Sequence, residues 1–158
     1  CFMKKFLFDC GTRDPNSAGG IFALRFMLGA MMLFGHGIPK LMAFGKIKDA
    51  FPVPDFFPLS FMSPPVSLLS AMFAEVVCAI CLILGVATRS AAFLLAFTMV
   101  VAAFNIHAGA PWFIGPGVSA AKEPALLYLV PMIAIIFTGA GLWSVDSKII
   151  KDSRRRRW

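Results

Sequence analysis

Apolar residues fall into four long blocks along the chain, and the segments between them are rich in proline, glycine or charge. Residues 90–121 and 124–145 carry no charged side chain, whereas residues 67–88 carry only Glu75 and residues 18–38 carry only Arg25. A helix of about 20 residues crosses the hydrocarbon core of a bilayer. The pattern therefore predicts an all-α fold, a bundle of four transmembrane helices at about residues 18–38, 66–87, 91–110 and 124–145.

The segments outside these blocks divide the chain into three parts. Residues 1–17 are expected to form an N-terminal segment, residues 18–145 the membrane domain, and residues 146–158 a basic tail. The connection 39–65 contains six prolines, and it begins with Pro39. We place the end of the first span at about Ile38 and leave open whether the helix persists past Pro39.

The overall composition favours a surface that faces lipid. Of the 158 residues, 59% are hydrophobic and 15% are charged, and the mean hydropathy is +0.81. A soluble domain carries about 25% charged residues. We therefore expect the lipid bilayer to be the main surroundings of this protein. The chain contains no phosphate-binding loop, dinucleotide glycine pattern or His-Glu-x-x-His motif.

The distribution of lysine and arginine predicts the orientation. With both termini inside, the inner segments hold ten of these residues and the outer segments hold four, Lys40, Lys46, Lys48 and Lys122. Positive residues prefer the cytoplasmic side, so we expect a multi-pass protein of a bacterial inner membrane with both termini cytoplasmic. The run Arg154, Arg155, Arg156 and Arg157 is expected to contact anionic lipid or an acidic partner protein, and not nucleic acid.

Two charged residues inside the predicted helices need partners. A charge in the middle of a bilayer costs at least about 2.5–3.5 kcal/mol and normally faces protein or water. Arg25 and Glu75 lie about 10 Å and 18 Å from the inner ends of their helices, given 1.5 Å per residue. One interpretation is that the two side chains pair and fix helix register; the other is that they belong to a proton or substrate relay.

Further polar residues lie near the outer ends of the helices. His36 and His107 are predicted at the same depth, with Asn105 just below His107, and helical spacing places His36 on the face that carries Arg25. Lys40 continues this face if the helix persists past Pro39. We therefore predict that Glu75, His36 and His107 form a proton or quinone site in an outward-opening cavity, with Arg25, Lys40 and Asn105 as ligand-binding residues.

Less specific interpretations of these residues remain open. Each histidine is also typical of a hydrogen-bonded residue between helices, and two histidines at equal depth also fit axial haem ligation. Cys78-Ala79-Ile80-Cys81 matches a C-x-x-C redox motif. Its position within a predicted membrane helix favours small packing residues instead, and we expect no metal site.

The order and spacing of several short motifs resemble the DoxX family of small four-helix membrane proteins. The resemblance covers about residues 20–145. It rests on Arg25, His36-Gly37-Ile38-Pro39-Lys40, Phe44-Gly45, Glu75, the segment 84–89, Met99, Ala102, His107 and the segment 122–128. The tail after Asp146 and the loop 51–65 fall outside it.

The resemblance implies a membrane subunit associated with redox chemistry. The family includes relatives of a membrane subunit of thiosulfate:quinone oxidoreductase, so quinone is the expected ligand and no covalent cofactor is expected. One alternative is a non-catalytic structural subunit of a larger membrane assembly, and another is a small-molecule transporter. Other membrane-protein subunits or further copies of the chain are the expected partners.

Overall fold

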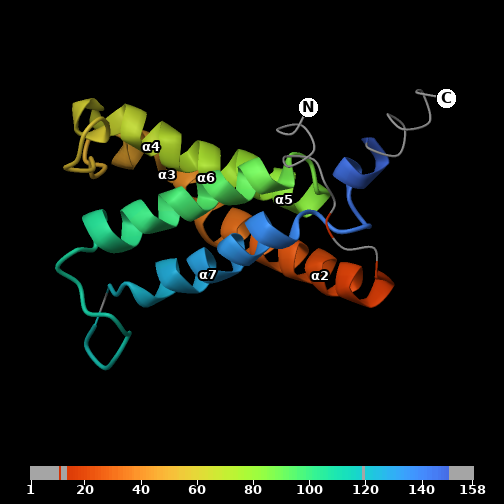
Figure 1. Ribbon diagram of the computed structural model, residues 1–158. Helices are drawn as coiled ribbons and strands as arrows, with labels where there is room; N and C mark the ends of the chain where they lie inside the picture. The colour runs from red at the N-terminus through yellow and green to blue at the C-terminus, as the bar shows by residue number, and fades with distance from the viewer. Residues whose placement is uncertain (1–10, 12–13, 119, 150–158) are drawn as a thin grey trace.

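The computed structural model describes residues 11, 14–118 and 120–149, and all regular structure in this part of the chain is helical (Figure 1). Three helical segments contain a π-helical turn, labelled η. The elements are α2 (Pro15–Met32), η1 (Leu33–Gly37), α3 (Ile38–Ile47), the 3₁₀ turn η2 (Leu59–Phe61), α4 (Pro64–Met72), η3 (Phe73–Cys78), α5 (Ala79–Leu84), α6 (Thr88–Val101), η4 (Ala102–Ile106) and α7 (Glu123–Thr138). Residues 145–149 are also helical.

Three of the continuous helical segments are long and apolar enough to cross a membrane. They run over Pro15–Ile47, Pro64–Leu84 and Thr88–Ile106, with 33, 21 and 19 residues. The α7 helix has 16 residues, which gives it a length of about 24 Å at 1.5 Å per residue. The all-α prediction is thus confirmed for the described residues. Three of the four predicted spans correspond to helices that are long and apolar enough to cross a membrane.

The first helix extends beyond Ile38, where the predicted span ends. The helix continues through Pro39 to Ile47, and the π turn η1 ends at Gly37, two residues before the proline. In that turn the amide of Ile38 donates to the carbonyl of Leu33, five residues earlier. Pro39 has no amide to donate, and its ring crowds the carbonyl four residues back. The wider π turn accommodates this proline without ending the helix.

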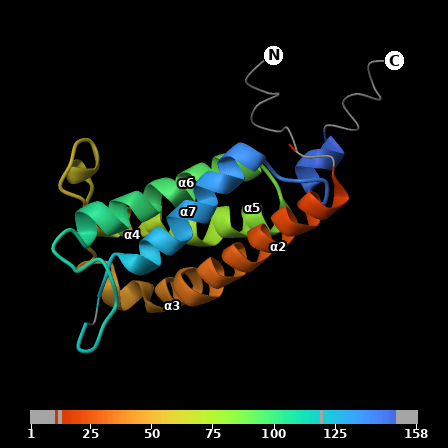
Figure 2. The ribbon, with the colours of Figure 1, turned by 60° about the horizontal axis from the view of Figure 1, so that its bottom comes forward.

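The helices pack side by side in a bundle (Figures 1 and 2). The α2 helix packs along α5, and α6 packs along α7. The connections 48–63 and 107–122 lie at one end of the bundle (Figure 2). The α5–α6 turn, the start of α2 and residues 145–149 lie at the other end (Figure 2).

A cluster of buried charges holds this second end together. Arg25 is fully buried, and its guanidinium donates to the carbonyls of Leu82 at 2.6 Å and Trp143 at 2.9 Å. Leu82 lies in the last turn of α5, where a cation is favourable because the helix ends in unpaired carbonyls. Arg25 therefore ties α2 to the end of α5.

The start of α6 is capped by a side chain from far along the chain. The carboxylate of Asp146, 1% exposed, accepts hydrogen bonds from the amides of Ala87 at 2.8 Å and Thr88 at 2.9 Å, and from the hydroxyl of Thr88 at 2.9 Å. Ala87, the N-cap residue, has no side-chain oxygen to do this itself. The segment predicted as a tail thus begins, at Asp146, with a residue packed into the bundle.

The outer surface of the helices is rich in large apolar side chains. Residues such as Phe34, Leu127, Val130 and Phe137 are 65–75% exposed. Apolar surface that is continuous over a whole bundle is not stable in water. Lipid is the solvent that fits this surface.

Candidate functional site

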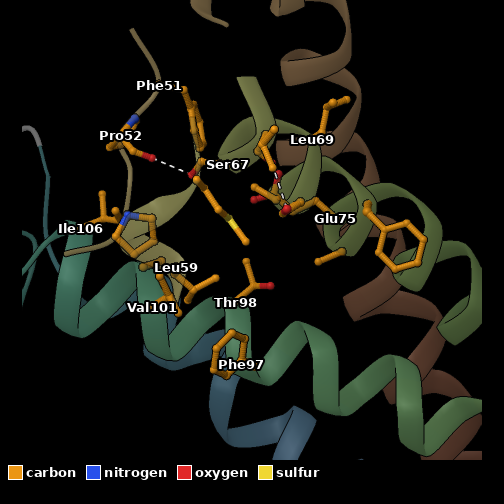
Figure 3. A pocket seen from close by; sticks show the side chains of 18 of the residues that line it. Phe51, Pro52, Leu59, Ser67, Leu69, Glu75, Phe97, Thr98, Val101 and Ile106 are labelled. Carbon is orange, nitrogen blue, oxygen red and sulfur yellow. Dashed lines mark hydrogen bonds between the residues drawn. The ribbon is translucent and has the colours of Figure 1, made fainter. Parts of the chain in front are cut away.

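A cavity of about 680 Å³ lies near the end of the bundle that carries the long connections. Its walls come from α3, from α4 and η3, from α6 and η4, and from the loop 51–62 (Figure 3). Most lining side chains are apolar, and the polar or charged ones are Lys40, Ser67, Ser70, Glu75, Thr98 and His107. A largely apolar cavity of this size with a few polar groups is typical of a small-molecule site.

Lys40 and Glu75 form an ion pair in this cavity. The ammonium of Lys40 contacts Oε1 of Glu75, and the side chains are 27% and 4% exposed. The other carboxylate oxygen, Oε2, is buried and has no hydrogen-bond partner. The Lys40 ammonium also lies 5.9 Å from the centre of the Phe51 ring. The buried charge at Glu75 is therefore neutralised on one side, and its second oxygen is left available.

The pairing of Arg25 with Glu75, one of the two interpretations of these charges, does not occur. Arg25 donates to the carbonyls of Leu82 and Trp143. Glu75 pairs instead with Lys40, which follows the π turn η1. Up to Met32 the buried positions of the first helix follow α-helical steps, Arg25, Gly29 and Met32, but the next is Gly37, five residues later. Lys40 follows three residues after Gly37, on the same face. The α-helical spacing used in the prediction placed His36 on this face instead.

Gly37 allows the two helices to approach closely at this level. A Cβ atom at Gly37 would lie 2.7 Å from the backbone oxygen of Glu75. Only glycine fits this contact, since a methyl group here would have to displace backbone. The approach brings α3 close enough to η3 for Lys40 to reach the carboxylate.

The structure brings together only part of the predicted site. Glu75, Lys40 and His107 line the cavity, whereas His36, Asn105 and Arg25 are not among its lining residues. The exposed His36 packs edge-on against Tyr128 of α7, with ring centres 5.7 Å apart. The prediction that His36, Glu75, Asn105 and His107 share this one cavity is therefore wrong, and the two histidines do not meet in it.

Asn105 forms a hydrogen bond with the loop 51–62, which contributes one wall of the cavity. Its side-chain oxygen accepts a hydrogen bond from the amide of Asp55 at 3.1 Å. The hydroxyl of Ser67 donates to the carbonyl of Pro52 at 2.8 Å, which fixes a second point (Figure 3). The loop 51–62, which the resemblance did not cover, thus forms one wall, and these contacts hold it in place. The serines and Thr98 are site residues that the sequence analysis missed, although Thr98 is a rare polar residue in an apolar helix.

Apolar side chains from two helical segments line the cavity and are also partly exposed. Leu69 and Phe73 on one side and Leu94 and Phe97 on the other line the cavity and are also 39–53% exposed. Figure 3 shows Leu69 and Phe97 on opposite sides of the space. The cavity thus combines an exposed apolar lining with a polar end near Glu75.

Each of the three π turns bears on this region. Glu75 lies in η3, Asn105 lies in η4, and η1 sets the position of Lys40. Single π turns inside α-helices are frequent at functional sites. Two of them, η3 and η4, contribute lining residues, which supports the assignment of this cavity as the candidate site.

Cys78 and Cys81 pack at the core between the helices. Cys78 belongs to the core cluster, and the half-buried Cys81 packs against it. Among residues 11, 14–118 and 120–149, no group of three or more His, Cys, Asp and Glu side chains is arranged to hold a metal ion. The run Arg154–Arg157 lies outside the described residues, so its contact with lipid or a partner stays a prediction.

The chain has the features of a multi-pass helical membrane protein. It has three long apolar helical segments, charges buried within the bundle and an apolar outer surface. A cavity of about 680 Å³ lies between its helices. The chain belongs to the DoxX family, whose family model matches residues 20–108. This confirms the resemblance found in the sequence.

Two relatives come from Haemophilus influenzae, and both are described as uncharacterised proteins. One is 31% identical over 153 residues, which are 95% of this chain and 96% of the relative. The other is 38% identical over 84 residues, which are 53% of this chain and 63% of the relative. No solved structure matches this chain significantly.

Proposed function

We propose that the chain is the membrane subunit of a quinone-linked redox assembly, and that its cavity binds the headgroup of a lipid-soluble quinone. The observation that carries this proposal is the cavity's form: it is lined by exposed apolar side chains and has the Lys40–Glu75 pair and His107 in its wall. A ligand that dissolves in the bilayer and ends in a polar ring matches both features. Its reversible two-electron chemistry is the contribution of the quinone itself.

The residues of the chain have separable tasks in this proposal. Lys40 and His107 supply hydrogen-bond donors for an oxygen of the ring, and Glu75 supplies an acceptor. The aromatic and aliphatic walls, among them Phe51, Phe73 and Phe97, exclude water from these polar groups. The fixed loop 51–62 closes the cavity at the end of the bundle, and in this proposal the ligand enters from the side, past the exposed apolar lining.

A cavity-filling variant tests the proposal. We expect quinone to copurify in near-stoichiometric amounts with the wild type, and Thr98→Trp to lower that amount about tenfold or more, because the indole occupies the space of the headgroup. Quinone extracted from protein purified in mild detergent is measured by mass spectrometry.

Thr138→Trp is the matched control. Thr138 lies outside the cavity, but both threonines donate to the carbonyl four residues back at 2.9 Å, Thr98 to Leu94 and Thr138 to Ala134. Thr138→Trp should therefore keep the wild-type content of quinone. Equal content in both variants would mean simple carry-over with lipid and would contradict the proposal, as would a wild type without quinone.

We also propose that α7 completes a four-span bundle in a bacterial inner membrane, with both termini cytoplasmic. The α7 helix packs along α6, and exposed aromatic residues such as Trp112 and Phe113 precede it, as is typical of a membrane interface. The excess of lysine and arginine on the side of residues 145–149 supports the orientation.

Cysteine labelling tests this topology. In a background without the native cysteines, an impermeant maleimide added outside intact spheroplasts should label Lys46→Cys and leave Lys148→Cys unlabelled until the membrane is opened. Both positions are exposed, so accessibility alone does not separate them. Labelling of Lys148→Cys from outside would overturn the orientation.

A further inference from the structure

The cavity presents mainly hydrogen-bond acceptors to a ligand. Its three hydroxyl groups belong to Ser67, Ser70 and Thr98. Each hydroxyl donates its single proton to a backbone carbonyl oxygen, those of Pro52, Val66 and Leu94, at 2.8, 2.9 and 2.9 Å. A hydroxyl that has donated its proton offers only lone pairs to further partners.

Among these acceptors, Oε2 of Glu75 is the one that is most costly to leave without a hydrogen-bond partner. In the ion pair with Lys40 this group is a carboxylate, which accepts hydrogen bonds and has no proton to donate. Oε2 is buried, lacks a hydrogen-bond partner and belongs to a residue that is 3% exposed. An unsatisfied acceptor in the interior is costly, and more so when it is charged. A ligand that brings a donor to this oxygen removes that cost.

The hydrogen-bond donors of the cavity are less costly to leave without a ligand, because they are more exposed than Glu75. The side chain of Lys40 is 27% exposed, and its ammonium already contacts Oε1 of Glu75 and lies near the Phe51 ring. The His107 side chain is half-buried. These donors can find partners outside the cavity, whereas the buried oxygen of Glu75 cannot.

From this imbalance we infer that the cavity selects the reduced ligand, a hydroquinone whose O–H group donates to Glu75, over the oxidised quinone. This inference rests on the proposed function and adds the redox state of the ligand. The two forms have the same ring, but the quinone oxygens only accept, whereas the hydroquinone oxygens also donate. Glu75 is the residue that distinguishes them.

Binding measurements with both redox forms test the inference. Decyl-ubiquinol and decyl-ubiquinone are titrated anaerobically, by calorimetry, into the wild type in detergent. We expect the hydroquinone to bind about tenfold more tightly or better, as a charge-assisted hydrogen bond implies. Glu75→Gln can turn an amide N–H toward the ligand, so this variant should lose the preference. Glu123→Gln is the control, because Glu123 accepts from the amide of Ile114 outside the cavity.

A second measurement needs no variant. In the methyl ether of an alkylphenol, a methyl group replaces the donor proton while the ring and its oxygen stay the same. Neither compound takes part in quinone redox chemistry, so the wild type should bind the phenol about tenfold more tightly. Equal affinity for the two redox forms, tighter binding of the quinone, equal affinity for phenol and ether, or an unchanged preference in a folded Glu75→Gln protein would overturn the inference and leave the proposed function standing. Binding of neither redox form would overturn the proposed function itself.

Discussion

Asp146→Ala is expected to lower the free energy of unfolding by about 2–4 kcal/mol, because each buried donor left without a partner costs about 1–3 kcal/mol. The carboxylate accepts three hydrogen bonds at the start of α6, from two amides and one hydroxyl. Loss of a helix cap alone costs about 0.5–2 kcal/mol, and a cap this deeply buried belongs at the upper end. Denaturant or thermal unfolding in micelles, followed by circular dichroism, measures the effect.

Asp49→Ala is the comparison for this variant. Asp49 is exposed in the turn after α3, and surface substitutions usually change stability by less than about 0.5 kcal/mol. Asp146→Asn keeps one acceptor oxygen and should lie between the wild type and Asp146→Ala. If Asp146→Ala unfolds at the same point as Asp49→Ala, the cap contributes nothing and residues 145–149 are not part of the folded unit.

Gly85→Ala should destabilise the same end of the bundle by about 2–5 kcal/mol, the sum of about 1–2 kcal/mol for a left-handed backbone and about 1–3 kcal/mol for overpacking. Gly85 ends α5 with a φ of +71°. A Cβ atom there would lie 2.6 Å from Cβ of Ser144 and 2.7 Å from Nη1 of Arg25. Both neighbours are buried, and the guanidinium is held by two carbonyls, so neither can move freely.

Gly45→Ala provides the opposite expectation with the same chemical change. Gly45 lies in α3 with open space at its Cβ position, so alanine should leave stability unchanged or raise it by about 0.5–1 kcal/mol. The same unfolding assay measures both variants. A Gly85→Ala protein as stable as Gly45→Ala would show that the turn can relax, and the packing argument at this junction would be wrong.

Much of the fold was predictable because the cost of polar groups in lipid leaves few arrangements for a chain with such long apolar blocks. Glu75 was expected inside the bundle for this reason, and it is buried there. The end of the first helix was not predictable from Pro39 alone, because one π turn before a proline decides whether the helix stops or continues.

The candidate site was only partly accessible from the sequence. His107 was expected near Glu75 from its depth, which depends on residue count and tolerates small errors. Lys40 was expected there only on condition that the helix persists past Pro39, and it does. The placement of His36 depended on rotation around the helix axis, where one residue more or less changes the direction by about 100°. No local pattern indicated that Asp146 caps a helix 58 residues earlier, since contacts at that separation leave no periodic signal.

The π turn at Leu33–Gly37 also bears on how a site of this kind arises in evolution. Loss of a single residue within it would restore a regular helix, and every side chain beyond would turn by about 100°, so that Lys40 would no longer face Glu75. The amino acids on either side would remain the same. In comparisons among relatives, a one-residue gap inside this helix is therefore a marker of a gained or lost binding site even where both charged residues are retained.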